Sequence, residues 1–535
     1  MRNYTVKFES ITAKEFYTEQ RARVTYWAIA EVTQAGNIIA TGKTLDEFFD
    51  VILPMCGRFT VIDLNFYGYF LLYWLYEHGY AFNRKLDTSK SFDVWVNDTG
   101  TWYSLRAVHK RKNKKRDYAE FVDAHQKLIV PVAELPQAFG LTCPTNTPEL
   151  EAMATAQAVY IMHKQGMRGI TLSADCFREY VHTIGEKAYK SFFPELPDYV
   201  CDAVQQAYVG GYNYIAPKYI NKDIRVNSYD ENAMYAAIML YCRLPCGMAM
   251  EYYGQPPKKG YLYVHKFAAS FSLKDGYLPT VKLRDRLDVG GDYLIEQRTP
   301  IEMVMTSVDY ELFLKHYNII SIEHIGGFAF QARNGMFTEY MSRWSDIKIY
   351  TTIPAQRTIA KHHLTHLYGV FGRSKTRKSK TPEYSGGVVS WHIATNTGKF
   401  NYMPIAAFVT AYARKQIIEI GQANFDRFVC ACTDSVKLEY VPNANNTPPG
   451  VKLSRATGDF KLEYEAAPFK ILKHNTYAYI TDGVLNIVAS GMSAEARTAI
   501  TDISQFTYDL KVKNYITQPV KGGAIKISHT LILNA

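Results

Sequence analysis

The chain has 535 residues, a formal net charge of +10, 47% hydrophobic residues and 21% charged residues. This composition is typical of a globular protein of several domains; it excludes a disordered chain, and no apolar run is long enough to predict a membrane span or a signal peptide. The eight cysteines are too sparse for a disulfide framework, while the excess positive charge and the 14% of aromatic residues favour a nucleic-acid surface.

Helical and strand-like patterns alternate along the whole chain. The N-terminal third has an α/β pattern, with a buried strand predicted at residues 60–64 and an apolar helix at 67–78. The overall prediction is an α/β protein, more fully an α+β multidomain one. Further helices are predicted at residues 149–166, 307–316, 337–345, 355–368 and 408–421, and further strands at 208–214, 224–229, 260–264, 428–431 and 436–440.

Two strongly basic runs stand out between these elements. Residues 109–116 are predicted to form a solvated loop. Residues 373–380 lie between a helix and a β-rich stretch, so a hairpin arm is expected there. Either run can touch a nucleic acid, and the simpler interpretation of each is a solvated loop.

Two short acidic turns carry the residues best suited to chemistry. Asp230 ends one β-like run and Asp434 ends another. Two carboxylates brought together by the fold can bridge two Mg²⁺ ions, which stabilise the attacking and leaving oxygens of phosphoryl transfer. Either turn alone is weak evidence, because an aspartate at the end of a strand usually only caps a turn.

The predicted helix at 355–368 has a face suited to a nucleoside triphosphate. Arg357, Lys361 and Thr365 recur every four residues, so they lie on one helical face. Tyr368 continues that face, and Gly369 is the expected helix stop. Two cations suit phosphates, and an aromatic ring suits a base.

The order of these motifs is similar to that of the family B DNA polymerases, in particular their protein-primed branch from phages and linear plasmids. The Asp230 turn resembles the first catalytic motif, Asp-x-x-Ser-Leu-Tyr-Pro. Residues 361–369 resemble the second, Lys-x-x-x-Asn-Ser-x-Tyr-Gly, and residues 432–435 resemble the third, Asp-Thr-Asp-Ser.

Other segments extend the resemblance over essentially the whole chain. Residues 208–211 match the Tyr-x-Gly-Gly motif between the exonuclease and polymerase domains, and residues 476–477 resemble the end of the Lys-x-Tyr primer motif. Residues 271–280 lie where the protein-primed branch carries a first insertion, which is associated with docking of a terminal protein. Residues 373–400 fit its second insertion, which is associated with strand displacement, and residues 521–523 resemble the end of the thumb.

The resemblance implies a right-hand polymerase with palm, fingers and thumb, preceded by an RNase H-like domain of the exonuclease type. The implied domains are the exonuclease-like domain (1–170), the first part of the palm (171–260), the first insertion (261–340), the fingers (341–372), the second insertion (373–402), the second part of the palm (403–475) and the thumb (476–535).

The resemblance also implies roles for single residues. Asp230 and Asp434 would hold two Mg²⁺ ions, for which Mn²⁺ can substitute, with the backbone carbonyl of Glu231 as a further ligand. Tyr235 would be the steric gate that excludes a 2′-hydroxyl, and Tyr368 would pack against the nascent base pair. The other implied contacts are Lys348, Arg357 and Lys361 with the triphosphate, Tyr208, Gly210 and Gly211 with the template, Lys473 and Tyr477 with the primer end, and Thr433 with DNA.

Some positions of the polymerase motifs depart from the family pattern. Cys432 stands where the third motif has its first aspartate, so we expect activity to survive with altered metal affinity. Asn475 replaces the lysine of the primer motif, and Lys473 can compensate from nearby. The remaining departures are Ala233 and Ala236 for Ser and Pro, and Thr365 for Asn.

The exonuclease motifs depart further. The first segment, Asp-x-Glu in the family, has Lys7 before Glu9, and the second ends in Tyr67 instead of an aspartate. A lysine there would place a positive charge where a Mg²⁺ should bind. Asp63 and Glu151 complete a degenerate site, for which we predict weak or absent proofreading.

The predicted function is therefore a DNA-directed DNA polymerase that replicates a linear viral or plasmid genome from a protein primer. Its expected partners are template-primer DNA, deoxynucleotides, a terminal protein and a single-stranded DNA-binding protein, with no membrane, and it would act as a monomer in the host cytoplasm. One alternative is a non-catalytic DNA-binding replication factor derived from a polymerase. Another is a DNA-primed or primer-independent enzyme of the same fold.

Overall fold

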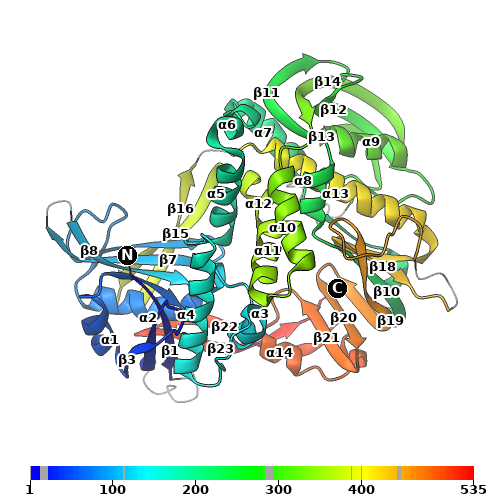
Figure 1. Cartoon of the computed structure of the whole chain (residues 1–535). Helices are drawn as coiled ribbons and strands as arrows, with labels where there is room; N and C mark the ends of the chain where they lie inside the picture. Colours follow the sequence, from blue (N-terminus) through cyan, green and yellow to red (C-terminus); the bar gives the residue numbers. More distant parts are fainter. Residues whose placement is uncertain are drawn as a thin grey trace.

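The computed structural model describes residues 2–11, 22–112, 115–282, 293–386, 388–398, 401–442 and 447–534. Figure 1 shows an N-terminal domain at the lower left, a green sheet at the upper right, and two long helices between them. The prediction of a multidomain α/β protein is confirmed. Within this described part, no helix is long and apolar enough to cross a membrane.

The N-terminal domain is built on a ten-stranded sheet. Its strand order is β16-β15-β6-β7-β8-β4-β1-β2-β3, and β5 pairs with β6. Eight strands come from the N-terminal region and two from the predicted second insertion. The strands are β1 (Arg2–Ser10), β2 (Val24–Glu31), β3 (Ile38–Gly42), β4 (Gly57–Val61), β5 (Ala81–Phe82), β6 (Ser91–Asn97), β7 (Trp102–Lys112), β8 (Lys115–Asp123), β15 (Thr376–Ser385) and β16 (Val388–Thr397).

The two basic runs both lie in hairpins of this sheet. The prediction of a loop at residues 109–116 is wrong for the described residues, because β7 extends to Lys112 and β8 begins at Lys115, and these two residues pair. Residues 113–114 lie outside the described residues. The hairpin arm predicted at residues 373–380 is confirmed as β15 and β16. Ser379 and Lys380 of β15 pair with β6, so the second insertion shares a sheet with the N-terminal domain.

Helices and the C-terminal hairpin cover this sheet. Helix α2 packs against β7 and β8 and also against β23. A Cβ at Gly523 would lie 2.4 Å from the ring of Phe70, so the C-terminal hairpin is seated on α2 where only glycine fits. These elements are α1 (Leu45–Ile52), α2 (Leu64–Glu77), α3 (Leu135–Phe139), α4 (Pro148–Lys164), β22 (Lys511–Val520) and β23 (Gly523–Ile532).

A seven-stranded sheet carries both acidic turns, with the strand order β21-β20-β19-β10-β18-β17-β9. Helix α13 packs over β9, β17 and β18 and against α8. The predicted strand at residues 208–214 begins only at Tyr212, so the Tyr-x-Gly-Gly segment precedes the sheet. The elements are β9 (Tyr212–Ile215), β10 (Ile224–Glu231), α8 (Met234–Tyr241), α13 (Pro404–Ala423), β17 (Phe428–Thr433), β18 (Ser435–Glu439), β19 (Phe460–Lys473), β20 (Thr476–Thr481) and β21 (Val484–Ala489).

The green sheet at the upper right of Figure 1 lies in the region of the predicted first insertion. It begins at Leu244, ahead of the expected limit at residue 261, because β11 pairs with β14. The proposed limit at residue 475 likewise falls between two paired strands, β19 and β20. The elements of this sheet are β11 (Leu244–Tyr253), β12 (Tyr261–Leu273), β13 (Glu296–Thr306), α9 (Ser307–His316) and β14 (Tyr317–Arg333).

Two adjacent helices, α10 and α11, correspond to the predicted fingers and face the seven-stranded sheet (Figure 1). The predicted helix at 355–368 ends early, at His366, and Gly369 lies inside the next helix instead of stopping the first. At this break, the N–H of Val370 donates to the carbonyl of Leu367 at 3.2 Å, which is the three-residue spacing of a 3₁₀ turn. The remaining helices are α5 (Leu172–Ile184), α6 (Glu186–Phe192), α7 (Asp198–Ala207), α10 (Thr338–Tyr350), α11 (Pro354–His366), α12 (Tyr368–Phe371) and α14 (Ala494–Thr498).

Candidate active site

The two aspartates predicted to bind metal lie side by side on the seven-stranded sheet. Asp230 is opposite Ser435 in the pairing of β10 with β18, and Asp434 is the turn residue between β17 and β18. The N–H of Glu231 donates to the carbonyl of Asp434 at 2.9 Å, which fixes the two acidic turns against each other. The fold therefore joins two motifs that are about two hundred residues apart in the sequence.

Electrostatics at this position favour a cation. Burial, together with the negative charge of Asp230, raises the pKa of Asp434 to about 6. Lys461, opposite Asp230 on β19, places its ammonium 2.9 Å from Asp230 Oδ2. Partial burial opposes the charge on Lys461, but its contact with Asp230 prevails and raises the pKa of the lysine. One lysine thus offsets part of the charge of the two aspartates.

Glu231 is buried directly behind the two aspartates. Glu231 is 2% exposed, and its side-chain Oε2 has no hydrogen-bond partner among the described residues. Burial raises the pKa of this carboxyl to about 8, and the negative charges of Asp434 and Asp230 contribute. Burial therefore disfavours the charged form of the Glu231 carboxyl, and the backbone carbonyl of this residue is the ligand that the resemblance implies.

A set of cations faces the two aspartates from α10 and α11. Arg357 and Lys361 lie on the exposed face of α11, as the spacing predicts. Lys348 on α10 is half-buried beside them. Burial lowers its pKa, and the positive charges of Lys361 and Lys461 lower it further. These side chains form a cationic wall opposite the acidic turns, suited to a polyphosphate.

Three tyrosines from separate motifs meet beside this wall. The rings of Tyr235 on α8 and Tyr368 on α12 lie 4.0 Å apart between centroids, at 40°. Burial raises the pKa of Tyr368, and its hydroxyl interacts with both Tyr235 and Tyr208. A Cβ at Gly372 would lie 2.7 Å from Tyr208 Oη, so the third tyrosine is closely packed as well. The predicted steric gate and base contact therefore form one aromatic surface.

The Tyr-x-Gly-Gly segment lies against the third acidic motif. A Cβ at Gly211 would lie 2.7 Å from Thr433 Cγ2, so glycine is required for this close approach. Thr433 itself has a left-handed backbone, with φ of +59°. Gly210 differs, because a Cβ there would meet nothing within 4 Å in the part of the chain that the structure describes. Gly210 thus presents open backbone to the outside.

Two departures from the family pattern touch each other at the primer side. Cys432 Sγ lies 3.7 Å from Asn475 Oδ1. Tyr477 is half-buried two residues beyond Asn475. Lys473, expected to compensate for Asn475, donates instead to the backbone carbonyl of Asn534 at 2.9 Å. A neutral thiol–amide pair therefore occupies the position where the family pattern has an acid and a lysine.

The residues of the predicted degenerate exonuclease site also gather, but around a lysine. Lys7 Nζ on β1 lies 2.5 Å from Glu151 Oε2 on α4. Asp63 begins α2 with a left-handed backbone, φ of +61°. Burial raises the pKa of Tyr67, and the negative charges of the three nearby carboxylates, Glu9 among them, raise it further. The ammonium of Lys7 therefore offsets the negative charge of the Glu151 carboxylate.

The family model for type B DNA polymerases, organellar and viral, matches residues 155–445, which contain both aspartates, the cationic wall and the three tyrosines. The chain belongs to this family of DNA polymerases. It is a DNA-directed DNA polymerase, and the alternative of a non-catalytic binding factor is not needed to explain it.

Relatives and solved structures agree with the family. The DNA polymerases of Bacillus phages M2 and phi29 are 27% and 28% identical to this polymerase over 424 residues, 74% of the chain and 74% and 73% of their own lengths. That of Streptococcus phage Cp-1 is 27% identical over 473 residues, 82% of this chain and 81% of its own. The structure of phi29 DNA polymerase with primer-template DNA and incoming nucleotides has a TM-score of 0.91 at 24% identity over both full chains, which shows the same fold.

Four charged residues beside the polymerase site were not singled out in the sequence. Lys461 and Glu463 share one face of β19, and Ser228 Oγ donates to Glu463 at 3.1 Å. Lys437, 3% exposed, donates to Ser435 Oγ at 3.1 Å, next to the turn that carries Asp434. Strand alternation places Lys461 and Glu463 on one face, but only the register shows that this face meets the aspartates. The fourth residue is Arg414 on α13.

Proposed function

We propose that the polymerase adds deoxynucleotides to a 3′-hydroxyl by two-metal catalysis. The observation that supports this best is the backbone bond between the two acidic turns, which sets Asp230 and Asp434 side by side. Their donor set fits divalent cations, because burial and the negative charge of Asp230 both raise the pKa of Asp434, and a shared positive charge would offset both effects. Two Mg²⁺ ions held by Asp230, Asp434 and the Glu231 carbonyl would stabilise the attacking and leaving oxygens; Mn²⁺ can take the same ligands.

The chain's own side chains then position the nucleotide. Lys361 and Arg357, with Lys348 behind them, neutralise the triphosphate. Tyr235 lies beneath the sugar, where a 2′-hydroxyl would collide with its ring, and Tyr368 packs against the new base pair. Positioning and charge stabilisation of this kind supply most of the catalysis in phosphoryl transfer.

The same geometry supports contacts with DNA. The open backbone at Gly210 and the close seat of Gly211 on Thr433 suit the approach of a template phosphate. Tyr208, in the same segment as these two glycines, is part of the aromatic surface. Tyr477 borders the primer end, with the exposed Lys473 close by. Structures of phi29 DNA polymerase include complexes with primer-template DNA and with single-stranded DNA, which agrees with these roles.

Primer extension on a gel tests this function. Wild type should extend a labelled DNA primer with Mg²⁺ and all four deoxynucleotides, and Asp230→Asn should not. DNA binding by the variant, measured by fluorescence anisotropy, should persist, because the carboxylate is not needed to hold DNA. Extension by both proteins would contradict the assignment of Asp230.

The first insertion supports initiation from a protein primer. The sheet of β11 to β14 lies in chain order between the segments that resemble the first and second catalytic motifs, which supports its interpretation as the first insertion. Transfer of labelled deoxyadenylate to a protein encoded by the same genome tests this. Extension of DNA primers without any such transfer would favour a DNA-primed enzyme.

Strand displacement is supported by a cavity beneath the second insertion. The cavity, of about 1010 Å³, lies between the N-terminal sheet, α5 and β15. Trp95 and Tyr103 stack at 4.3 Å on its wall, and Arg373 and Arg377 line it with other arginines. Cations and stacked rings suit a single template strand. Extension through a downstream duplex on a gapped template tests the function.

Weak or absent proofreading follows from the Lys7–Glu151 ion pair. Wild type should leave labelled single-stranded DNA intact in Mg²⁺. Digestion that Glu9→Ala abolishes would show a working exonuclease and overturn this part of the proposal.

A further inference from the structure

Lys461 of β19 places an ammonium directly on one of the two catalytic aspartates. The residue lies opposite Asp230 in the pairing of β10 with β19, and its Nζ is 2.9 Å from Asp230 Oδ2. A second acid, Glu463 on the same strand, has its Oε1 3.6 Å from this nitrogen. The side chain of Lys461 is 51% exposed. The ammonium is therefore held mainly by Asp230, while much of its stem is in contact with solvent.

The oxygen that Lys461 contacts is also a proposed metal ligand. An ammonium and a divalent cation on one carboxylate would bring two positive charges within a few ångströms of each other. A divalent cation gains more at this position, because it interacts with Asp230 and Asp434 together, whereas the ammonium contacts Asp230. We therefore expect the lysine to leave Asp230 when the proposed metal ions bind.

A triphosphate offers the displaced ammonium a new partner. Lys348, on α10 of the cationic wall, is affected by Lys461: burial lowers the pKa of Lys348, and the positive charges of Lys361 and Lys461 lower it further. Lys461 and the wall therefore act on the same space, one from the sheet and the other from the helices. A lysine carries three donors on a flexible stem, so it can turn from a carboxylate to a nearby phosphate without movement of the backbone.

We propose that Lys461 is a nucleotide-binding residue that is held on Asp230 in the free enzyme and transfers to the triphosphate of the incoming nucleotide. This rests on the proposed binding of metal and triphosphate between the seven-stranded sheet and α11. In the free enzyme the ammonium competes with a metal ion for Asp230. In the nucleotide complex it neutralises the triphosphate from the side opposite the wall. The nucleotide thus frees Asp230 for metal, so the binding of one favours the binding of the other.

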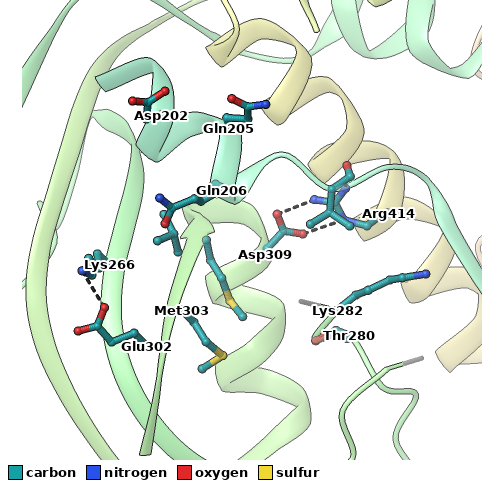
Figure 2. A pocket seen from close by; sticks show the side chains of 14 residues that line it. Asp202, Gln205, Gln206, Lys266, Thr280, Lys282, Glu302, Met303, Asp309 and Arg414 are labelled. Atoms are coloured by element: carbon teal, nitrogen blue, oxygen red, sulfur yellow. Dashed lines mark hydrogen bonds and ion pairs between the residues drawn. The ribbon is translucent and has the colours of Figure 1, made fainter. Parts of the chain in front are cut away.

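The simpler interpretation of the contact is a cross-strand ion pair that only stabilises the sheet. The sheet of β11 to β14 contains a matched pair. Figure 2 shows it on the wall of a cavity of about 580 Å³, where Lys266 of β12 lies 2.7 Å from Glu302 of β13, and where Arg414 of α13 pairs with Asp309 of α9 at 2.6 Å. The side chain of Lys266 is 43% exposed, similar to that of Lys461, but its acid is not a catalytic aspartate. Lys266→Gln is therefore the control for the loss of a half-exposed lysine between two strands.

The experiment measures two affinities of the full chain for wild type, Lys461→Gln and Lys266→Gln. The first is that for Mn²⁺ without nucleotide, from the electron paramagnetic resonance signal of free Mn²⁺. The second is that for dTTP in Mg²⁺ with a dideoxy-terminated primer-template, from the dTTP concentration that protects the complex against competitor DNA. Neither measurement requires catalysis, and thermal unfolding checks that each variant folds.

The two affinities of Lys461→Gln should change in opposite directions. Mn²⁺ should bind about threefold more tightly, because the competing ammonium is gone. The nucleotide should bind about tenfold more weakly, because a charged hydrogen bond is lost. Lys266→Gln should match wild type in both measurements. A lysine that only stabilised the sheet would not produce this opposition.

Two outcomes overturn the inference. One is an affinity of Lys461→Gln for dTTP equal to that of Lys266→Gln; the other is an affinity for Mn²⁺ that does not rise. If Lys461→Gln does not fold, wild type decides, because dTTP should protect Lys461 but not Lys266 from reductive methylation. Equal modification of Lys461 with and without dTTP would overturn the inference as well.

Two further variants separate this inference from the proposed function. If Asp230→Asn binds Mn²⁺ as wild type does, the proposed metal site is wrong. If Arg357→Gln binds dTTP as wild type does, the proposed triphosphate site is wrong. If Arg357→Gln binds dTTP weakly and Lys461→Gln binds it normally, only the role of Lys461 is wrong.

Discussion

The polymerase contains two clusters of carboxylates that differ in where their lysine lies. In the seven-stranded sheet, Lys461 approaches Asp230 from a neighbouring strand at 2.9 Å. In the N-terminal domain, Lys7 stands in the first exonuclease motif itself and pairs with Glu151 at 2.5 Å. In the first arrangement, burial and the negative charge of Asp230 raise the pKa of Asp434; in the second, the ammonium of Lys7 offsets the charge of Glu151.

The difference shows that carboxylates alone do not identify a two-metal site. Both clusters hold several acids within a small volume. What separates them is the balance between repulsion, which a divalent cation relieves, and an internal ammonium, which relieves it already. The proposed loss of proofreading therefore requires no loss of the acids or of the fold.

The most direct test of this difference between the two clusters is to remove one carboxylate from each. Asp434→Asn should reduce the rate of primer extension by about 10³-fold or more, because a ligand of the proposed metal ions is lost. Glu151→Gln should not change the rate of primer extension, and single-stranded DNA should remain undigested. The measurement is single-turnover extension together with digestion of a labelled single strand.

Near-normal extension by Asp434→Asn would show that the crowded pair is not a metal site. Nuclease activity in wild type that disappears in Glu151→Gln would show that the Lys7 pair does not silence the N-terminal site.

Sugar selection should depend on the aromatic surface beside the palm carboxylates. Tyr235→Val removes the ring that the proposed function places beneath the sugar, so discrimination between deoxynucleotides and ribonucleotides should fall by about 100-fold. The ratio of kcat/KM for the two substrates measures this. Tyr241→Val, an exposed tyrosine at the other end of α8, is the control and should not change the ratio. An unchanged ratio in Tyr235→Val would contradict the steric role.

A buried acid of the N-terminal domain should make stability depend on pH. Burial raises the pKa of Asp123 to about 7, and its Oδ2 has no hydrogen-bond partner among the described residues. The folded state thus holds a proton that the unfolded chain releases near pH 4, so the free energy of unfolding should decrease as pH rises from about 4 to about 7.

Asp123→Asn should remove this dependence. The amide oxygen can still accept from Leu64 N–H, now 3.1 Å from Oδ1, so the variant should be more stable than wild type at pH 8 by on the order of 2 kcal/mol. Denaturant unfolding at pH 5 and pH 8 measures it, with the exposed Asp50→Asn as control. If the free energy of unfolding of Asp123→Asn changed with pH as much as that of wild type, Asp123 would be ionised in the folded protein.

The smallest effect is expected from restoring the missing acid of the third motif. Cys432→Asp adds a carboxylate near Asp434, so the Mg²⁺ concentration for half-maximal extension should fall by about threefold. Cys432→Ser, which adds no charge, should behave as wild type. A Mg²⁺ titration of extension compares the three proteins. An equal shift in Cys432→Ser would assign the effect to packing against Asn475 instead of charge.

Local patterns predicted much of this fold and part of the site. The helix predicted at residues 307–316 is confirmed to the residue, because its capping threonine and its apolar spacing are both in the sequence. The shared exposed face of Arg357 and Lys361 follows from helical spacing alone. The family motifs identified the aspartates and tyrosines, and the structure brings them together.

Contacts that depend on strand register or on distant segments could not be predicted. The charges of residues 109–116 predict a solvated loop, yet β7 and β8 pair there as far as Lys112 with Lys115, and charge alone does not distinguish the two. Nothing local links Arg414 to Asp309 or Cys432 to Asn475. Lys461 reaches Asp230 only because β19 pairs with β10 in one particular register.

The C-terminal hairpin has a consequence for how the polymerase is made. Ala524 belongs to the same buried cluster as Phe70 and Val389, so the core of the N-terminal domain includes side chains from three distant parts of the chain. During synthesis the first of these emerges from the ribosome long before the last. Until the hairpin has been synthesised, part of the apolar surface of the domain stays uncovered, and the hairpin packs last. Folding of the first domain is thereby tied to translation of the whole polymerase.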